Sequence, residues 1–78
     1  MTRSGFLRAV EEILDVPPRT LKDEDTRYTI ARWTSLSDFQ IFALITSEFG
    51  IEPDSALIEA ETVGDLVSVL DSKGAFRE

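Results

Sequence analysis

Apolar residues recur at helical spacing from residue 3 to residue 14. The positions that share one helix face, at i, i+3/i+4 and i+7 spacing, are Phe6, Leu7, Val10, Ile13 and Leu14. Glu11 falls among the polar residues on the opposite side. Pro17 and Pro18 follow, and the residue before a proline is pushed out of the helical region. The pattern therefore predicts a helix over Arg3–Leu14.

The longest apolar-periodic segment predicts a second helix over Ser35–Phe49. Its apolar residues on one broad side are Phe39, Ile41, Phe42, Ile45 and Phe49, with Leu36 and Ala43 at the edge. Ser37, Gln40, Ser47 and Glu48 occupy the other side, with Leu44 exposed among them. Gly50 follows, where a left-handed residue ends many helices. We expect the three Phe residues to form the centre of the core.

Two further helices are predicted downstream. A short one, over Asp54–Glu59, follows Pro53, a residue suited to the first turn of a helix. The other covers Val63–Ser72, where Thr62 and Asp65 have the spacing of a capping box. Gly74 can end it.

The stretch from residue 15 to residue 34 has no clear period. A loop of this length is uncommon in a compact domain, so we expect it to pack over the core through its scattered apolar side chains. Those side chains are Val16, Leu21, Tyr28, Ile30 and Trp33. The sequence thus predicts an all-α, small four-helix bundle with three main helices, one short helix and a long first loop. We expect one domain over residues 1–78, with its core at about residues 4–73.

Composition removes several classes of chemistry. The chain has 78 residues without cysteine or histidine, which excludes disulfides, thiolate metal sites and imidazole catalysis. No loop has the spacing of an EF-hand, and we expect no metal site. No apolar run approaches the roughly 18 residues of a membrane span. The N-terminus lacks the apolar segment of a secretory signal, so we expect a cytoplasmic protein.

The net charge of −7 is unevenly distributed. Residues 1–33 hold six basic and six acidic side chains, whereas residues 34–78 hold nine acidic and two basic ones. An acidic field repels phosphate backbones, so nucleic acid is not an expected partner. The acidic field either steers the protein toward basic surfaces on other proteins or only keeps the protein soluble.

Ser35 stands where the polar loop enters the second helix. The segment Ser35-Leu36-Ser37-Asp38 matches the [ST]-x-x-[DE] capping box, so the local pattern predicts that Ser35 caps this helix. A hydroxyl at a helix N-terminus is also a physically sensible attachment point for a phosphodiester, because unpaired N–H groups and the macrodipole favour an anion there. The two roles do not exclude each other.

From about Phe6 to Leu70 the chain resembles the acyl carrier proteins, the phosphopantetheine-binding four-helix bundles of fatty-acid and polyketide synthesis. The resemblance is strongest at Trp33-Thr34-Ser35-Leu36 and at Glu48-Phe49-Gly50-Ile51, which open and close the second helix. Residues 51–54 and 62–66 resemble the approaches to the family's third and fourth helices. The family's usual pattern before Leu is Gly-x-Asp-Ser. Arg32 and Thr34 replace the Gly and the Asp, which indicates a divergent member.

The resemblance implies that a phosphopantetheinyl transferase attaches 4′-phosphopantetheine to Ser35 and supplies the base and Mg²⁺ for the transfer. The thiol of the arm would hold acyl groups as thioesters, so the protein would be a carrier and not an enzyme. It would act as a monomer with acyl-loading and acyl-processing enzymes of fatty-acid, polyketide or related synthesis. Basic docking patches on these enzymes would contact Leu36, Asp38, Ala43 and Glu48.

Two other functions remain open from the residues themselves. The chain could be a protein-interaction module with the same fold and no prosthetic group, a reading that Arg32 and Thr34 favour mildly. It could also be an enzyme, although carboxylates and hydroxyls would then be its only catalytic groups. Three observations separate these functions. A carrier gains the mass of a phosphopantetheinyl group, an interaction module binds its partner without modification, and an enzyme is active alone.

Overall fold

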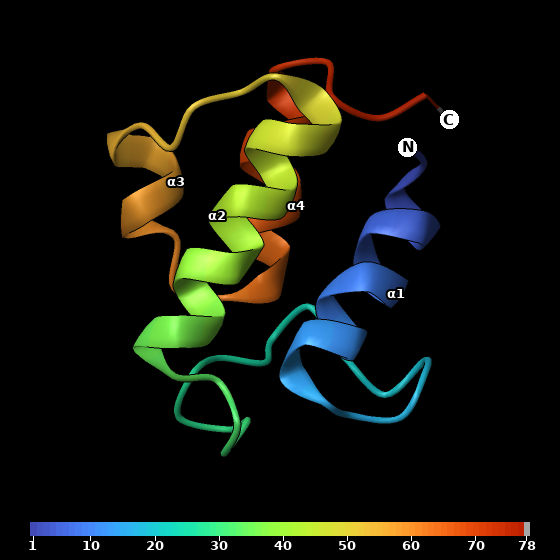
Figure 1. Ribbon diagram of the computed structural model, residues 1–78, viewed down its shortest axis with the longest axis vertical. Coiled ribbons are helices and arrows are strands. Elements are labelled where there is room, and N and C mark those ends of the chain that lie inside the picture. Colours follow the sequence, from blue (N-terminus) through green and yellow to red (C-terminus); the bar gives the residue numbers. More distant parts are fainter. Residues whose placement is uncertain (78) are drawn as a thin grey trace.

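The chain folds into a small all-α bundle. The computed structural model describes residues 1–77, which contain helices α1 (Arg3–Leu14), α2 (Ser35–Phe49), α3 (Ser55–Glu59) and α4 (Val63–Ser72) (Figure 1). The predicted bounds of the three main helices are confirmed, and α3 begins one residue later than expected. Within residues 1–77, no helix combines the length and the apolar character that crossing a membrane requires.

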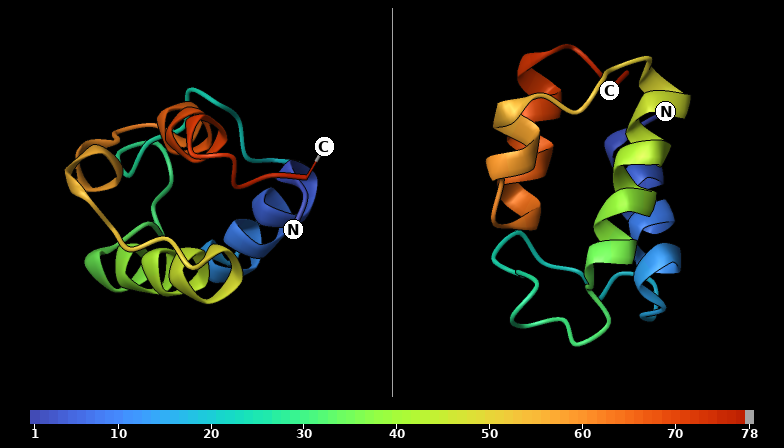
Figure 2. Two further views of the ribbon diagram at one scale, coloured as in Figure 1. Left: turned by 90° about the horizontal axis from the view of Figure 1, so that it is seen from above. Right: turned by 60° about the vertical axis from the view of Figure 1, so that its left-hand side comes forward.

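The four helices surround one interior. Seen from above, α1, α2, α3 and α4 follow one another around a ring (Figure 2). Helix α1 runs opposite to α2 and α4 (Figure 1). Helix α1 packs against α2, and α3 packs against α4. The connection from residue 15 to residue 34 crosses the end of the bundle at which α1 ends and α2 begins (Figure 2).

The buried apolar core draws on every helix and on the long loop. Its members are Phe6, Val10 and Leu14 of α1, Ile41 and Ile45 of α2, Leu57 of α3, Val63, Leu66, Val67 and Leu70 of α4, and Leu21 and Trp33 of the loop. The expectation that the loop packs through apolar side chains is confirmed for Leu21 and Trp33. It is wrong for Tyr28, which is 92% exposed. Leu44, expected to be exposed, packs partly buried against this core.

Three phenylalanines join both ends of the chain to α2. The ring centroids of Phe6, Phe49 and Phe76 lie 5.6–6.1 Å apart in tilted and edge-to-face arrangements. Such geometry suits the ring quadrupoles and adds to the burial of the rings. The guanidinium of Arg3 lies 5.8 Å from the centre of the Phe76 ring. The segment after α4 is therefore part of the packed structure.

Residues that flank the helices form hydrogen bonds with the backbone groups that the helix ends leave unpaired. Helix α1 ends at a left-handed Asp15, whose N–H donates to Glu12 while that of Val16 donates to Glu11. This Schellman turn ends α1 before the proline pair. The predicted left-handed Gly50 is confirmed, with φ at 67°. The capping box of Thr62 and Asp65 is confirmed as well.

Helix α3 starts late because Asp54 serves as its N-cap. The Asp54 carboxylate accepts the N–H of Leu57 at 3.1 Å and pairs with the Lys73 ammonium at 2.6 Å. The Lys73 ammonium, and then the Leu57 N–H, hold the pKa of Asp54 below its usual value. This contact joins the start of α3 to the end of α4, but its exposure to water keeps its contribution to stability small.

The start of the long loop is held by a buried carboxylate. Glu11 was expected on the polar face of α1, yet it is only 1% exposed. One of its oxygens accepts the backbone N–H groups of Thr20 and Leu21 at 2.9 and 3.0 Å. The other lies 2.6 Å from Nε of Arg8. A buried charge persists only when it is paired and hydrogen-bonded, so these contacts account for Glu11 in the interior.

The middle of the loop is held at the start of α4. Thr26 and Thr62 form an isolated antiparallel bridge. The N–H of Gly64 donates to the carbonyl of Asp23 at 2.9 Å, and a Cβ on residue 64 would meet that oxygen at 3.2 Å. A residue without a side chain lets the loop approach this closely.

The Glu11 contacts predict an acid-sensitive fold. Burial raises the pKa of Glu11, but hydrogen bonds from the loop backbone and from Arg8 outweigh it and lower the pKa below 4.5. Because the folded pKa is the lower one, Glu11 contributes its stability above the unfolded pKa and loses it as the pH falls through the folded value. Urea unfolding at pH 7 and at decreasing pH should show this loss.

Glu11→Gln is the matching variant. It should lower the free energy of unfolding at pH 7 by about 2–4 kcal/mol, because the buried N–H groups and Arg8 lose a charged acceptor. It should also flatten the acid dependence. Glu12→Gln, at an exposed position of the same helix, should do neither. An unchanged acid profile in Glu11→Gln would contradict the role given to this carboxylate.

Candidate functional site

Ser35 is the first residue of α2 and is exposed. The prediction that Ser35 caps this helix is wrong, because Thr34 is the N-cap. Thr34 has extended backbone angles, with φ at −108° and ψ at 178°, and its hydroxyl accepts the N–H of Ser37 at 3.4 Å. Among residues 1–77, no group forms a hydrogen bond with the Ser35 hydroxyl. The hydroxyl is therefore available to a reagent from solvent.

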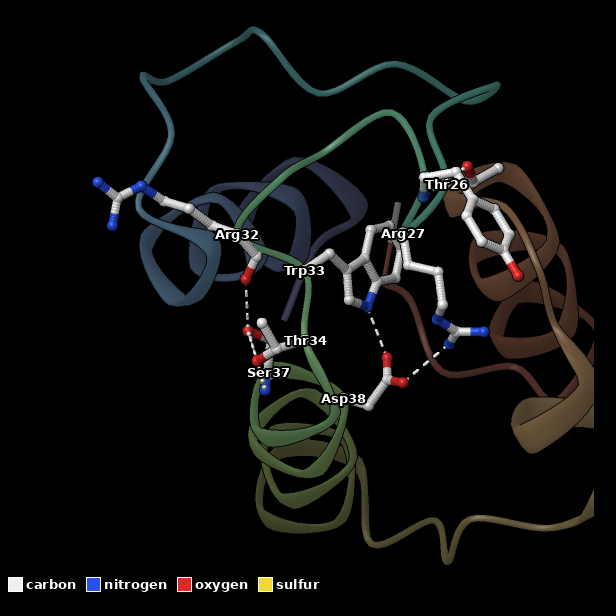
Figure 3. Close-up of polar contacts among 8 residues, drawn as sticks. Thr26, Arg27, Arg32, Trp33, Thr34, Ser37 and Asp38 are labelled. Atoms are coloured by element: carbon white, nitrogen blue, oxygen red, sulfur yellow. Dashed lines mark hydrogen bonds and ion pairs between the residues drawn. The ribbon is translucent and has the colours of Figure 1, made fainter.

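Side chains in the first turn of α2 form hydrogen bonds with residues before Ser35 in two places. On one side, the Ser37 hydroxyl donates to the carbonyl of Arg32 at 2.9 Å and lies 3.3 Å from the Thr34 hydroxyl (Figure 3). These contacts explain why Ser37, expected on the polar face, is only 6% exposed. The side chain of Arg32 pairs with Asp15 at 3.1 Å on the surface.

On the other side, Asp38 binds both Trp33 and Arg27. One carboxylate oxygen accepts the Trp33 indole N–H at 2.5 Å, and the other lies 2.8 Å from the Arg27 guanidinium (Figure 3). Trp33 is 5% exposed, and the Arg27 guanidinium lies 5.9 Å from the centre of its ring. We call these three residues the Trp33–Asp38–Arg27 network. In the expected capping box, the Asp38 carboxylate would accept the backbone N–H of the N-cap residue. Here it accepts the Trp33 indole N–H instead.

The expected partner-binding residues do not share one surface. Leu36 and Ala43, seven residues apart, lie on one exposed face of α2. Asp38 is turned toward the loop and is neutralised by Arg27. Glu48 is exposed in the last turn, roughly 140° around the axis from Ala43 for a helix of 3.6 residues per turn. The structure therefore brings Leu36 and Ala43 together and leaves Asp38 and Glu48 apart from them.

Phe39 extends this exposed face. It was expected in the core, but it is 71% exposed, and Leu36 is 67% exposed. Helix α2 has apolar residues on two faces, and only the one with Ile41 and Ile45 is buried. Ser35 stands four residues before Phe39, so the hydroxyl and the ring lie on the same side of the helix.

A shallow apolar groove continues from Phe39 along α2. It encloses about 230 Å³ and is lined by Phe39, Phe42, Ala43, Thr46 and Pro53. Phe42, also expected in the core, is half-buried at this groove. A second hollow, of about 470 Å³, is polar and lies beside α4. It is lined by Arg3, Asp23, Glu24, Thr62, Gly64, Asp65, Val67, Ser68 and Asp71.

The acidic side chains of the second hollow do not form a metal centre. Within residues 1–77, no group of three or more acidic side chains is arranged to hold a metal ion. Asp71 pairs with Arg3 at 3.6 Å across exposed surface. This hollow could not be predicted from the sequence, because its acidic residues come from the long loop and from α4.

Comparisons of the chain with protein-family models, with curated proteins and with solved structures find no match. The case for a function therefore rests on the residues and their geometry.

The reassigned cap predicts different stability effects for two adjacent hydroxyls. Thr34→Ala should lower the free energy of unfolding by about 1 kcal/mol, because the Ser37 N–H loses its acceptor. Ser35→Ala should change it by less than about 0.5 kcal/mol, because the side chain is exposed and its hydroxyl forms no hydrogen bond within residues 1–77. Urea unfolding of the two variants measures both values. The reverse order of effects would restore Ser35 as the cap.

Proposed function

We propose that this protein is a cytoplasmic carrier that receives 4′-phosphopantetheine on Ser35 and presents thioester-bound acyl groups to partner enzymes. The observation that carries this proposal is the position of Ser35. Its hydroxyl is exposed at the N-terminus of α2 and is free of capping, while the residues around it are held in place. The four-helix bundle with its long first loop and the carrier-like sequence around Ser35 also support it.

The site fits a phosphodiester. The first N–H groups of a helix lack intrahelical partners, and the positive end of the macrodipole lies beside them. In the transfer, Ser35 Oγ would form a bond to the pantetheine-bearing phosphorus of coenzyme A. The pyrophosphate P–O bond would break and adenosine 3′,5′-bisphosphate would leave. The chain has no histidine or cysteine to take the hydroxyl proton, so the base and Mg²⁺ would come from the transferase.

The exposed face of α2 suits contact with enzymes that act on the arm. Leu36 and Phe39 expose large apolar side chains next to Ser35, where a bound enzyme would cover them. The net charge of −7 would steer the carrier to basic surfaces. Because Arg27 neutralises Asp38, the apolar residues would contribute more to docking than this acid does.

The same face favours a second candidate function. An interaction module without a prosthetic group would use Leu36, Phe39 and the adjoining groove directly. Unpartnered apolar side chains of this size mark binding surfaces whether or not Ser35 is modified. The two functions differ in whether binding depends on the serine.

The carrier function predicts a covalent mass change. Co-expression with a broad-specificity phosphopantetheinyl transferase should raise the intact mass by one phosphopantetheinyl group. Ser35→Ala should abolish the gain, because no other hydroxyl occupies this position. Ser47→Ala, at an exposed serine near the other end of α2, is the matched control and should be modified fully. Wild-type protein that stays unmodified with several transferases would contradict the carrier function.

The interaction module predicts a different dependence. A partner that binds this face should bind Ser35→Ala as tightly as wild type. It should bind Phe39→Ser at least tenfold more weakly, since that change removes an exposed anchor of roughly 2 kcal/mol. Titration calorimetry with a purified native partner measures both affinities. Binding that requires the modified serine would favour the carrier instead.

A further inference from the structure

Each of the three residues before Ser35 is tied to the first turn of α2. The carbonyl of Arg32 accepts a hydrogen bond from Ser37, the Trp33 indole donates to Asp38, and Thr34 caps the helix. Ser35 is the exception in this segment, since nothing in residues 1–77 hydrogen-bonds its hydroxyl. The backbone that carries the hydroxyl is therefore fixed from both directions, while the hydroxyl itself stays exposed.

The Trp33–Asp38–Arg27 network is a part-buried contact between the loop and α2. Trp33 is 5% exposed, and the Asp38 side chain is 25% exposed. Both carboxylate oxygens are used, one by the indole and one by the guanidinium. A charge-assisted hydrogen bond is stronger than a neutral one, and it fixes geometry as well as energy. The network thus fastens the end of the long loop directly before Ser35.

We propose that Asp38 and Trp33 are positioning residues for phosphopantetheine transfer, with Asp38 acting through Trp33 on the placement of the Ser35 hydroxyl. This inference rests on the carrier function proposed above. The Ser35 oxygen must approach the phosphorus of coenzyme A in line, at roughly 3–3.5 Å, and small misplacements of reacting groups are costly. A loop that moved before Ser35 would spread the hydroxyl over many positions. The network removes that freedom before the transferase binds.

This role differs from a docking charge in a measurable way. If Asp38 attracted a basic patch, Asp38→Asn and Asp38→Ala would be equal, because both remove the charge. If Asp38 positions the loop, Asp38→Asn should retain much of the rate, because its amide oxygen can still accept the indole N–H. Trp33→Phe changes no charge, so only the positioning role expects it to slow transfer.

The test is a kinetic comparison with coenzyme A and one phosphopantetheinyl transferase that modifies the wild-type protein. The variants are Asp38→Ala, Asp38→Asn, Trp33→Phe and Arg27→Gln, with Glu12→Gln on α1 as the charge-matched control. All are measured at a temperature at which urea unfolding shows each to be folded. Arg27→Gln removes the ion pair with Asp38 on the more exposed side of the network. It therefore tests the positioning role even if a change at Trp33 prevents folding.

The expected result is a fall in kcat of about tenfold or more for Asp38→Ala and Trp33→Phe, with KM for the carrier little changed. Asp38→Asn should lie between Asp38→Ala and wild type, and the Asp38→Ala, Trp33→Phe double variant should be no slower than the slower single variant. A wild-type kcat in both Asp38→Ala and Trp33→Phe would overturn the positioning role but not the carrier function. The positioning role would also be overturned if Asp38→Asn and Asp38→Ala raised KM equally and left kcat unchanged. Wild-type protein that no transferase modifies would overturn the carrier function and this inference together.

Discussion

The buried carboxylate of Glu11 joins α1 to the start of the long loop through hydrogen bonds that add to the apolar packing of Leu21. It lies on α1 but accepts the backbone N–H groups of Thr20 and Leu21, with Arg8 beside it. In a chain of 78 residues the hydrophobic core is small, so a long connection is expensive to order. Charge-assisted hydrogen bonds are stronger than neutral ones, so Glu11 adds to the order that the apolar contacts of the loop provide.

Further along the loop, backbone contacts and a second carboxylate hold it in place. Backbone groups of Asp23 and Asp25 meet the start of α4, and the Asp38 carboxylate then receives Trp33 at the end of the loop. The carboxylates of Glu11 and Asp38 therefore have structural roles. Glu11 and Asp38 are engaged with Arg8 and Arg27, so they add less to the outward field than the formal charge suggests. The outward field comes mainly from the exposed acids of residues 48–71.

Helix positions could be predicted because local signals agree with the packing. The capping box at Thr62 and the left-handed Gly50 act over a few residues and need no tertiary information. The orientation of α2 could not be predicted in the same way. Phe39 and Ile45 are both apolar, and neither their spacing nor their size says which face meets α1. The network at Asp38 was missed because it joins residues 27, 33 and 38 through the path of an irregular loop. The position of Ser35 could be predicted, but its freedom from capping needed the geometry at Thr34.

The Phe6, Phe49 and Phe76 cluster has a consequence for how the molecule can be handled. It draws the N-terminal helix and the segment after α4 together, and the N-terminus and this segment lie at the same end of the bundle (Figure 1). Helix α2 starts at the other end of the bundle. A surface, dye or fusion joined to the N-terminus would lie at the opposite end of the bundle from Ser35. A protein immobilised in this way would keep the start of α2 accessible from solution.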